Sequence, residues 1–473
     1  MKTFKYLLVG AMLMGLGMPA MAQDAKAQVD EITKVIKSNP ADLADQVKAV
    51  YKKNKKNAPV LLGIGRAYYE VKDTVNARLY AEYARKADSK YSPVYILLGD
   101  LEALNSDGGN AAVQYQQAIY FDPKNPEAYY KYASVYRKVS PAEAVAKLEE
   151  LRTHRPDIAV DALAGRIYYS SNKFDDAIRC YSKVDMNNME EVDLTDYAMS
   201  LWFTQKYDKS LEVAKFALTK QPRDAGFNRL AFFNSTDLKD YDNALMYADA
   251  LFNKSDSAKF SYFDYTYYGN ALSGAKKYVE AIEMYKKALG QEITDKSKRA
   301  GVIKQLADGY KQNDDYANAI KTYEEFLKFV DAPSATDIAG LAQLYTQYAN
   351  TLQDEAKMET FKKAEGVYDD MEQKFPAAVE YTTFMKARVN SYMDPETKDG
   401  KAKPYYEKLA GMIEPKAEKD AADKARLVEC YRYLGYYTLL QDDKEGADVY
   451  WKKILELDPD NTIAKQALGI ADK

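Results

Sequence analysis

Small and apolar residues recur along this chain at steps of 33–34 residues in its first half and of 37–45 residues later. In each repeat a small residue is followed by further small or apolar residues four and seven positions later, including Val184. These offsets lie on one face of an α-helix. The small residues are Ala77, Ala111, Ala144, Ala177, Ser210, Ala244, Ala281, Ala319, Ala364, Ala402 and Ala447. The pattern predicts a series of helices that each bury one stripe.

Each of these helices is predicted to be the second of a pair, because another small residue recurs twelve positions upstream, in the first helix. These residues are Gly65, Gly99, Gly165, Ala198, Gly269, Ala307 and Gly435. A glycine inside a helix costs about 1 kcal/mol relative to alanine, so its recurrence indicates that the two helices of a pair approach closely. Prolines that would end the second helix follow twelve residues after the small residue, at Pro123, Pro156, Pro222, Pro376 and Pro459.

This combination resembles the tetratricopeptide repeat (TPR), which has glycine or alanine in its first helix and tyrosine three residues later. In that repeat alanine opens the second helix, an aromatic residue follows four positions later, and proline comes after the helix. The resemblance covers about residues 58–460 and is clearest before Pro222. It implies an all-α fold, a right-handed α-solenoid of about 12 antiparallel helix pairs. We expect a degenerate first pair over 23–57, regular repeats over 58–260, looser repeats over 261–460 and a capping helix over 461–473.

The first residues are typical of a bacterial secretion signal. Lys2 and Lys5 precede an uncharged apolar run, and Ala20-Met21-Ala22 provides a small-residue cleavage site. We therefore expect residues 1–22 to be removed after Ala22 and the mature chain to be periplasmic or secreted; the alternative is an uncleaved N-terminal anchor. Nothing later in the chain is apolar enough to predict a transmembrane segment.

Composition limits the chemistry available to the chain. It has one histidine, His154, and two cysteines, Cys180 and Cys430, whereas tyrosine occurs 42 times. One histidine cannot form the paired motifs of histidine metal sites, and seven repeats separate the cysteines, so we expect two free thiols. Most tyrosines fall on the buried stripes, where packing explains them. The sequence predicts no enzyme activity, no metal and no cofactor.

The inner surface of a TPR solenoid is formed by the first helices of the pairs, and residues near the recurrent glycine would face it. The predicted peptide-binding residues are Arg66, Tyr69, Tyr130, Arg137, Arg166, Tyr169, Trp202 and Asn270, and Met199, Phe232, Lys304 and Lys311 occupy related positions. Arginines among aromatic rings suit an extended peptide. The lysine of the family's carboxylate clamp is replaced by Thr266, so we expect that clamp to be absent.

These features favour a protein that binds another protein or peptide. The leading hypothesis is an exported, non-enzymatic adaptor or scaffold in the cell envelope. The alternatives are a structural or assembly factor of an outer-membrane or secretion complex, and an enzyme with a hidden site. With a formal net charge of −4, the chain gives no reason to expect a nucleic acid as partner.

Overall fold

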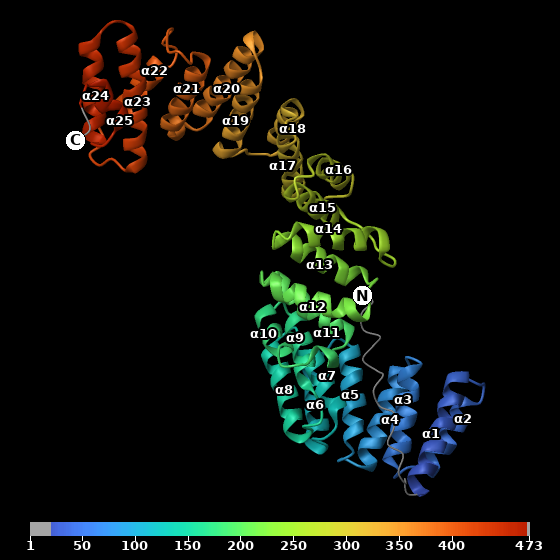
Figure 1. The fold of residues 1–473 in the computed structure, drawn as a ribbon. Helices are drawn as coiled ribbons and strands as arrows, with labels where there is room; N and C mark the ends of the chain where they lie inside the picture. The colour runs from blue at the N-terminus through green and yellow to red at the C-terminus, as the bar shows by residue number, and fades with distance from the viewer. Residues whose placement is uncertain (1–19, 471–473) are drawn as a thin grey trace. The chain divides into compact units, whose positions relative to one another are not determined.

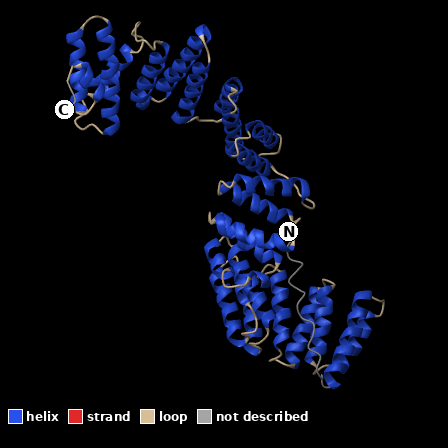
Figure 2. Cartoon of the chain, viewed as in Figure 1, coloured by secondary structure: helices blue, strands red, loops and turns tan. Residues whose placement is uncertain are grey.

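The computed structural model describes residues 20–470, with the side chains described from Asp24 onward. The predicted signal sequence lies outside the described residues except for its last three positions, which begin the first helix, so its cleavage stays a prediction. The chain forms two compact units, residues 1–234 and 235–473. Every regular element in the described part of the chain is helical (Figure 2).

The first unit consists of six helix pairs and the greater part of a seventh first helix (Figure 1). Its elements are α1 (Ala20–Ser38), α2 (Leu43–Lys53), α3 (Ala58–Glu70), α4 (Thr74–Ala87), α5 (Ser92–Leu104), α6 (Gly108–Phe121), α7 (Pro126–Tyr136), α8 (Pro141–His154), α9 (Val160–Ser170), α10 (Phe174–Tyr181), the 3₁₀ turn η1 (Met186–Asn188), α11 (Glu191–Phe203), α12 (Tyr207–Lys220) and α13 (Ala225–Asp237), in which the unit boundary falls.

The second unit continues the same alternation. Its elements are α14 (Tyr241–Asp249), the π-helical turn η2 (Ala250–Lys254), α15 (Tyr262–Gly274), α16 (Tyr278–Leu289), α17 (Lys296–Gln312), α18 (Tyr316–Phe329), α19 (Ala335–Thr351), α20 (Asp354–Lys374), the 3₁₀ turn η3 (Pro376–Ala378), α21 (Val379–Met393), α22 (Lys403–Ile413), α23 (Ala421–Leu440), α24 (Lys444–Leu457) and α25 (Thr462–Ala467).

Each unit is a stack in which a helix packs against its immediate neighbours in the chain. Twelve helix pairs followed by the short helix α25 account for the described elements, as the sequence period predicts. The protein is therefore an all-α solenoid of helical repeats.

The predicted stripes form the core. All eleven small residues are fully buried, and the residues four positions later are buried as well. Most of the eleven lie in the first turn of the second helix, whereas Ala364 lies in the middle of α20 and Ala402 directly precedes α22. The residue seven positions later is buried in ten of eleven repeats. Val184 is the exception, because α10 ends at Tyr181 and Val184 lies beyond the helix.

The recurrent glycines make room for aromatic rings. A Cβ atom placed on Gly99, Gly165 or Gly269 would lie 2.4–2.6 Å from ring atoms of the tyrosine sixteen residues later. Gly435 faces Trp451 at 3.1 Å in the same relation. The ring of the second helix thus occupies the place where the first helix lacks a side chain. In one repeat the residue sixteen positions before the tyrosine, Tyr323, is alanine (Ala307) and not glycine. The hydroxyl of Tyr323 there lies against Gly340 of the next repeat.

The turn between the two helices of a pair has a repeated backbone conformation, which the hydrophobic pattern does not predict. The residue five before the small residue has a positive φ in nine repeats, and none of these residues is glycine. Aspartate often follows and accepts a hydrogen bond from a backbone N–H of the second helix; Asp73, Asp107, Asp240 and Asp315 are examples. Such caps satisfy N–H groups that the helix leaves without partners.

Among the described helices, none combines the length and the apolarity needed to cross a bilayer.

Candidate functional site

The predicted peptide-binding residues lie on, or directly after, the first helices of their pairs. Seven are in the first unit, on α3, α7, α9 and α11, and Asn270 is on α15 in the second unit. Arg66 is exposed, and the other seven are half-buried. Their positions agree with the pattern of the repeat, whereas their binding role stays a prediction.

Arg166 is engaged within the protein. It donates to both carboxylate oxygens of Asp193, at 2.6 and 2.8 Å, and to Glu190 at 2.8 Å. Asp193, with 2% of its side chain exposed, also accepts the backbone N–H of Glu190 and so caps α11. Three of the five N–H donors of Arg166 are thereby used to hold α9 against α11.

Asn270 has a comparable internal role. Its Oδ1 accepts the hydroxyl of Tyr285 at 2.9 Å and the amide of Gln305 at 3.1 Å, which joins α15, α16 and α17. Asp100, which also follows a recurrent glycine, accepts the hydroxyl of Tyr115 at 2.8 Å and the ammonium of Lys131 at 2.7 Å. The position after the glycine therefore links neighbouring repeats.

Two of the remaining predicted residues, Tyr169 and Trp202, belong to an aromatic row on the first unit. The ring of Tyr169 lies 5.9 Å from that of Phe174, which stacks on Phe203 at 4.7 Å. Trp202 contacts Phe203 and Phe233 at 5.3 and 6.3 Å. The row continues across three successive first helices, α9, α11 and α13.

One half-buried carboxyl lies beside this row. Burial and the nearby charge of Asp193 raise the pKa of Asp196 to about 7, against the smaller opposing effects of the Tyr181 hydroxyl, at 3.4 Å, and of Arg166. Since the folded-state pKa exceeds the ordinary value of 3.8, folding opposes ionisation of this group. The contribution of Asp196 to the free energy of unfolding therefore falls as the pH rises from about 4 to 7 and stays level above 7.

We therefore expect Asp196→Asn to stabilise the protein at pH 8, by on the order of 1–2 kcal/mol after solvent screening. The gain should shrink steadily as the pH is lowered and vanish near pH 4. Urea unfolding of both proteins at pH 4.5, 6 and 8 measures it, with Glu212→Gln, an exposed position on α12, as the matched control. A gain that did not depend on pH would contradict the assignment.

The second unit carries a groove of about 550 Å³ along α19, between α17 and α21, which we call the groove above α19. Its lining residues are Lys304, Asp308, Lys311, Tyr323, Ala335, Thr336, Ala339, Gly340, Gln343, Leu344, Gln347, Met371, Ala378 and Tyr381. Tyr323, Ala339, Leu344 and Met371 of this lining are buried, whereas Asp308, Thr336, Gln343 and Gln347 are exposed. Of the inward-facing positions expected from the sequence, this groove brings together Lys304 and Lys311.

Lys304 is held in place in this groove. Its ammonium lies 2.8 Å from Asp337 Oδ1 and 5.2 Å from the ring centre of Phe326. The other oxygen of Asp337 accepts the backbone N–H and the hydroxyl of Ser334, at 3.1 and 2.7 Å, in the capping box that begins α19. The exposed amide of Gln343 reaches the hydroxyl of Tyr381 at 3.4 Å.

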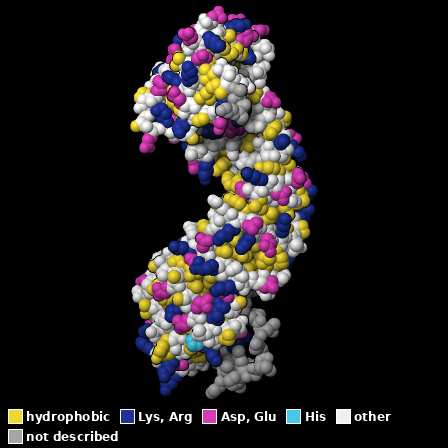
Figure 3. Space-filling model, turned by 60° about the vertical axis from the view of Figure 1, so that its left-hand side comes forward, with side chains coloured by type: hydrophobic (Ala, Val, Ile, Leu, Met, Phe, Trp, Pro, Cys, Tyr) yellow, Lys and Arg dark blue, Asp and Glu magenta, His cyan; other side chains and the backbone are white. Residues whose placement is uncertain are grey.

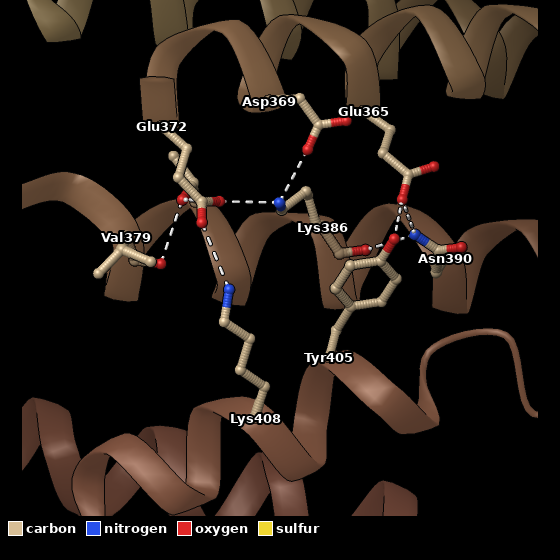
Figure 4. Close-up of polar contacts among 9 residues, drawn as sticks. Glu365, Asp369, Glu372, Val379, Lys386, Asn390, Tyr405 and Lys408 are labelled. Atoms are coloured by element: carbon tan, nitrogen blue, oxygen red, sulfur yellow. Dashed lines mark hydrogen bonds and ion pairs between the residues drawn. The ribbon is translucent and has the colours of Figure 1, made fainter. Parts of the chain in front are cut away.

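A polar network joins α20, α21 and α22 (Figure 4). Lys386 of α21, 9% exposed, donates to Asp369 and Glu372 of α20 at 2.9 and 2.8 Å. Glu372 also pairs with Lys408 of α22.

Glu365 accepts the amide of Asn390 at 2.9 Å and the hydroxyl of Tyr405. Asn390 occupies the position that glycine takes in the regular repeats, so here polar contacts replace the glycine–tyrosine packing.

The chain's one histidine and two cysteines are the side chains most often used in catalysis and metal binding, and they lie in different repeats. His154 is exposed and ends α8. Cys180 and Cys430 are free and buried, which agrees with the expectation of unpaired thiols. Within the described residues, no three histidine, cysteine or acidic side chains converge as metal ligands would.

Burial raises the pKa of both thiols, to about 12 for Cys430. Because the thiolate is the reactive form, we expect both cysteines to react with Ellman's reagent far more slowly in the native protein than after denaturation. Cys430, fully buried, should react more slowly than Cys180, which is 9% exposed. Rapid modification of Cys430 under native conditions would contradict this. The variants Cys180→Ala and Cys430→Ala assign the two phases.

Comparison with known proteins yields structural similarities. No protein-family model and no curated protein matches the chain. The C-terminal part of a TPR repeat-containing protein from Cytophaga hutchinsonii is 26% identical with a TM-score of 0.46, over 58% of this chain and 99% of that one. A tetratricopeptide repeat protein from Parabacteroides merdae is 16% identical with a TM-score of 0.34, over 53% and 97%. Pseudomonas aeruginosa pilF is 18% identical with a TM-score of 0.33, over 42% and 93%.

Proposed function

We propose that this protein is a non-enzymatic scaffold of the tetratricopeptide repeat type, exported to the cell envelope, which binds a protein partner along the first helices of its pairs. The groove above α19 carries the proposal. It combines buried apolar residues such as Ala339, Leu344 and Met371 with the exposed amides of Gln343 and Gln347, and three successive first helices or their flanking turns contribute to it. Such a surface suits a segment of another chain, since apolar side chains can pack on the apolar residues while the amides bind backbone groups.

The repeat architecture supports the same function. Each helix pair contacts mainly its neighbours, so the stack is an extended surface rather than one closed core. Positively and negatively charged side chains are intermingled over the visible face (Figure 3). A mixed surface of this kind favours a partner recognised by local groups over one attracted by a single large field.

Site-specific photocrosslinking in the producing cells tests the proposal. A benzophenone amino acid is placed at Gln347, an exposed residue of the groove, and at Lys321, an exposed residue of α18 outside it. We expect one reproducible protein adduct from position 347 that position 321 does not give. Identical adducts at both positions, or none at 347, would contradict the proposal. Cell fractionation of the same samples tests the envelope location.

A further inference from the structure

The groove above α19 has a defined length and direction. Its lining on α19 extends from Ala335 to Gln347, which is about 18 Å along the helix axis. This length matches about six residues of a polyproline II helix, which rises about 3.1 Å per residue. An extended segment lying parallel to α19 would therefore fill the groove.

Two lysines line one wall at a fixed spacing. Lys304 and Lys311 are seven residues apart on α17, so their side chains start from one face about 10.5 Å apart. In a polyproline II segment, residues three apart point in the same direction and are separated by about 9.3 Å. Two side chains spaced by three residues can thus reach the two ammonium groups at once.

Both ammonium groups have donors to spare. An ammonium has three N–H donors, and that of Lys304 uses one on Asp337, a carboxylate whose other oxygen is already bonded to Ser334. Lys311 pairs with Asp308 at 3.2 Å within one helix turn, a surface contact of little strength. The charged residues that line the groove are Lys304, Lys311 and Asp308, and Asp337, the partner of Lys304, is not part of the lining. The spare donors of the two ammonium groups therefore suit carboxylate acceptors of a ligand.

On α19 itself, two amides are arranged for backbone recognition. Gln343 and Gln347 are both exposed and four residues apart, about 6 Å along the helix. Alternate residues of a polyproline II segment are separated by about 6.2 Å and keep their N–H and C=O groups free of internal hydrogen bonds. The amide of Gln343 uses one N–H on the hydroxyl of Tyr381, which leaves its second N–H and its oxygen for a ligand. The amide of Gln347 can likewise donate to a carbonyl and accept from an N–H group.

We propose that this groove binds an extended acidic segment of a protein partner, in which two carboxylate side chains three residues apart contact Lys304 and Lys311 while Gln343 and Gln347 bind the backbone. The inference rests on the proposed function and specifies the ligand of the same groove. It requires side-chain carboxylates inside the segment and no free C-terminus.

Fluorescence anisotropy with the full chain tests the inference. The probe is a labelled hexapeptide, acetylated and amidated, of sequence Pro-Glu-Pro-Pro-Glu-Pro. We expect it to bind about tenfold more tightly than Pro-Gln-Pro-Pro-Gln-Pro and about fivefold more tightly than Pro-Glu-Pro-Glu-Pro-Pro, in which the acids are two residues apart. Lys304→Gln and Lys311→Gln should each weaken binding about tenfold, and Lys321→Gln on α18 should leave it unchanged.

Equal binding of the glutamate and glutamine peptides, or insensitivity to both groove variants, would overturn the inference. So would lysine-dependent binding of a uronic acid oligosaccharide without binding of the peptides. Circular dichroism of each variant shows whether it is folded. A protein adduct at position 347 together with failure of the peptides would refute this ligand assignment and leave the proposed function standing.

Discussion

Replacing Gly269 by alanine will lower the free energy of unfolding by about 2–3 kcal/mol. The added methyl group would lie 2.5 Å from Cε1 of Tyr285, and Tyr285 is itself nearly fully buried, with its hydroxyl bonded to Asn270. The ring therefore has to move against α15 and α17, or the helix pair has to open. Urea unfolding followed by far-UV circular dichroism measures the loss.

Gly301→Ala is the matched control, because Gly301 lies inside α17 and a methyl group added there would have nothing within 4 Å. We expect this change to stabilise the protein by up to about 1 kcal/mol, from helix propensity alone. Tyr285→Ala should reduce the cost of Gly269→Ala, since the pair Ala198 and Ala214 fills the same two positions in α11 and α12. Equal effects of the two glycine changes would show that the ring does not depend on the absent side chain.

Replacing Lys386 by methionine will destabilise the protein by about 2–4 kcal/mol near neutral pH. Lys386 is 9% exposed, and its loss would leave Glu372, 25% exposed, with weaker partners between α20 and α21 (Figure 4). Lys286→Met is the control, because Lys286 and Glu283 form a pair in which both side chains are about half exposed. There we expect a change within about 0.5 kcal/mol.

The effect of Lys386→Met should depend on pH in a defined direction. Burial acts to lower the pKa of Lys386, but the carboxylates of Glu372 and Asp369 outweigh burial and raise it. Burial acts to raise the pKa of Glu372, and Lys386 with its other donors lowers it. The contribution of the pair is thus fully present between about pH 5 and pH 10 and is lost in stronger acid or base. A cost that stayed constant down to pH 3 would contradict an ionic origin.

The repeated packing of the helix pairs was open to prediction from the sequence. Gly99 and Tyr115, Gly165 and Tyr181, and Gly269 and Tyr285 are each sixteen residues apart, and in the structure each glycine lies under its tyrosine ring. These contacts are local, because a helix, a short turn and a second helix bring the two residues together in every repeat. A fixed spacing in sequence therefore corresponds to a fixed contact in space.

The contacts between repeats could not be predicted in the same way. Arg166 pairs with Asp193, Lys304 with Asp337 and Arg388 with Glu429, at separations of 27, 33 and 41 residues. These separations vary because the turns and helices between the partners differ in length. The pairing of Arg166 with α11 could therefore not be foreseen, and the sequence predicted this residue to bind a ligand. Helix length also varies between repeats, so Val184 lies beyond the end of α10 although the repeat pattern places it on a helix.

The sequence by itself determined the helix pairs, the buried stripes and the lack of a recognisable catalytic motif, because all three depend on residues close together in the chain. Only the tertiary structure decided which charged side chains form ion pairs and where the surface of the stack carries a groove. The groove above α19 results from three first helices meeting around Ala339 and Gly340. Its position depends on how successive repeats pack, and no spacing within a single repeat encodes that.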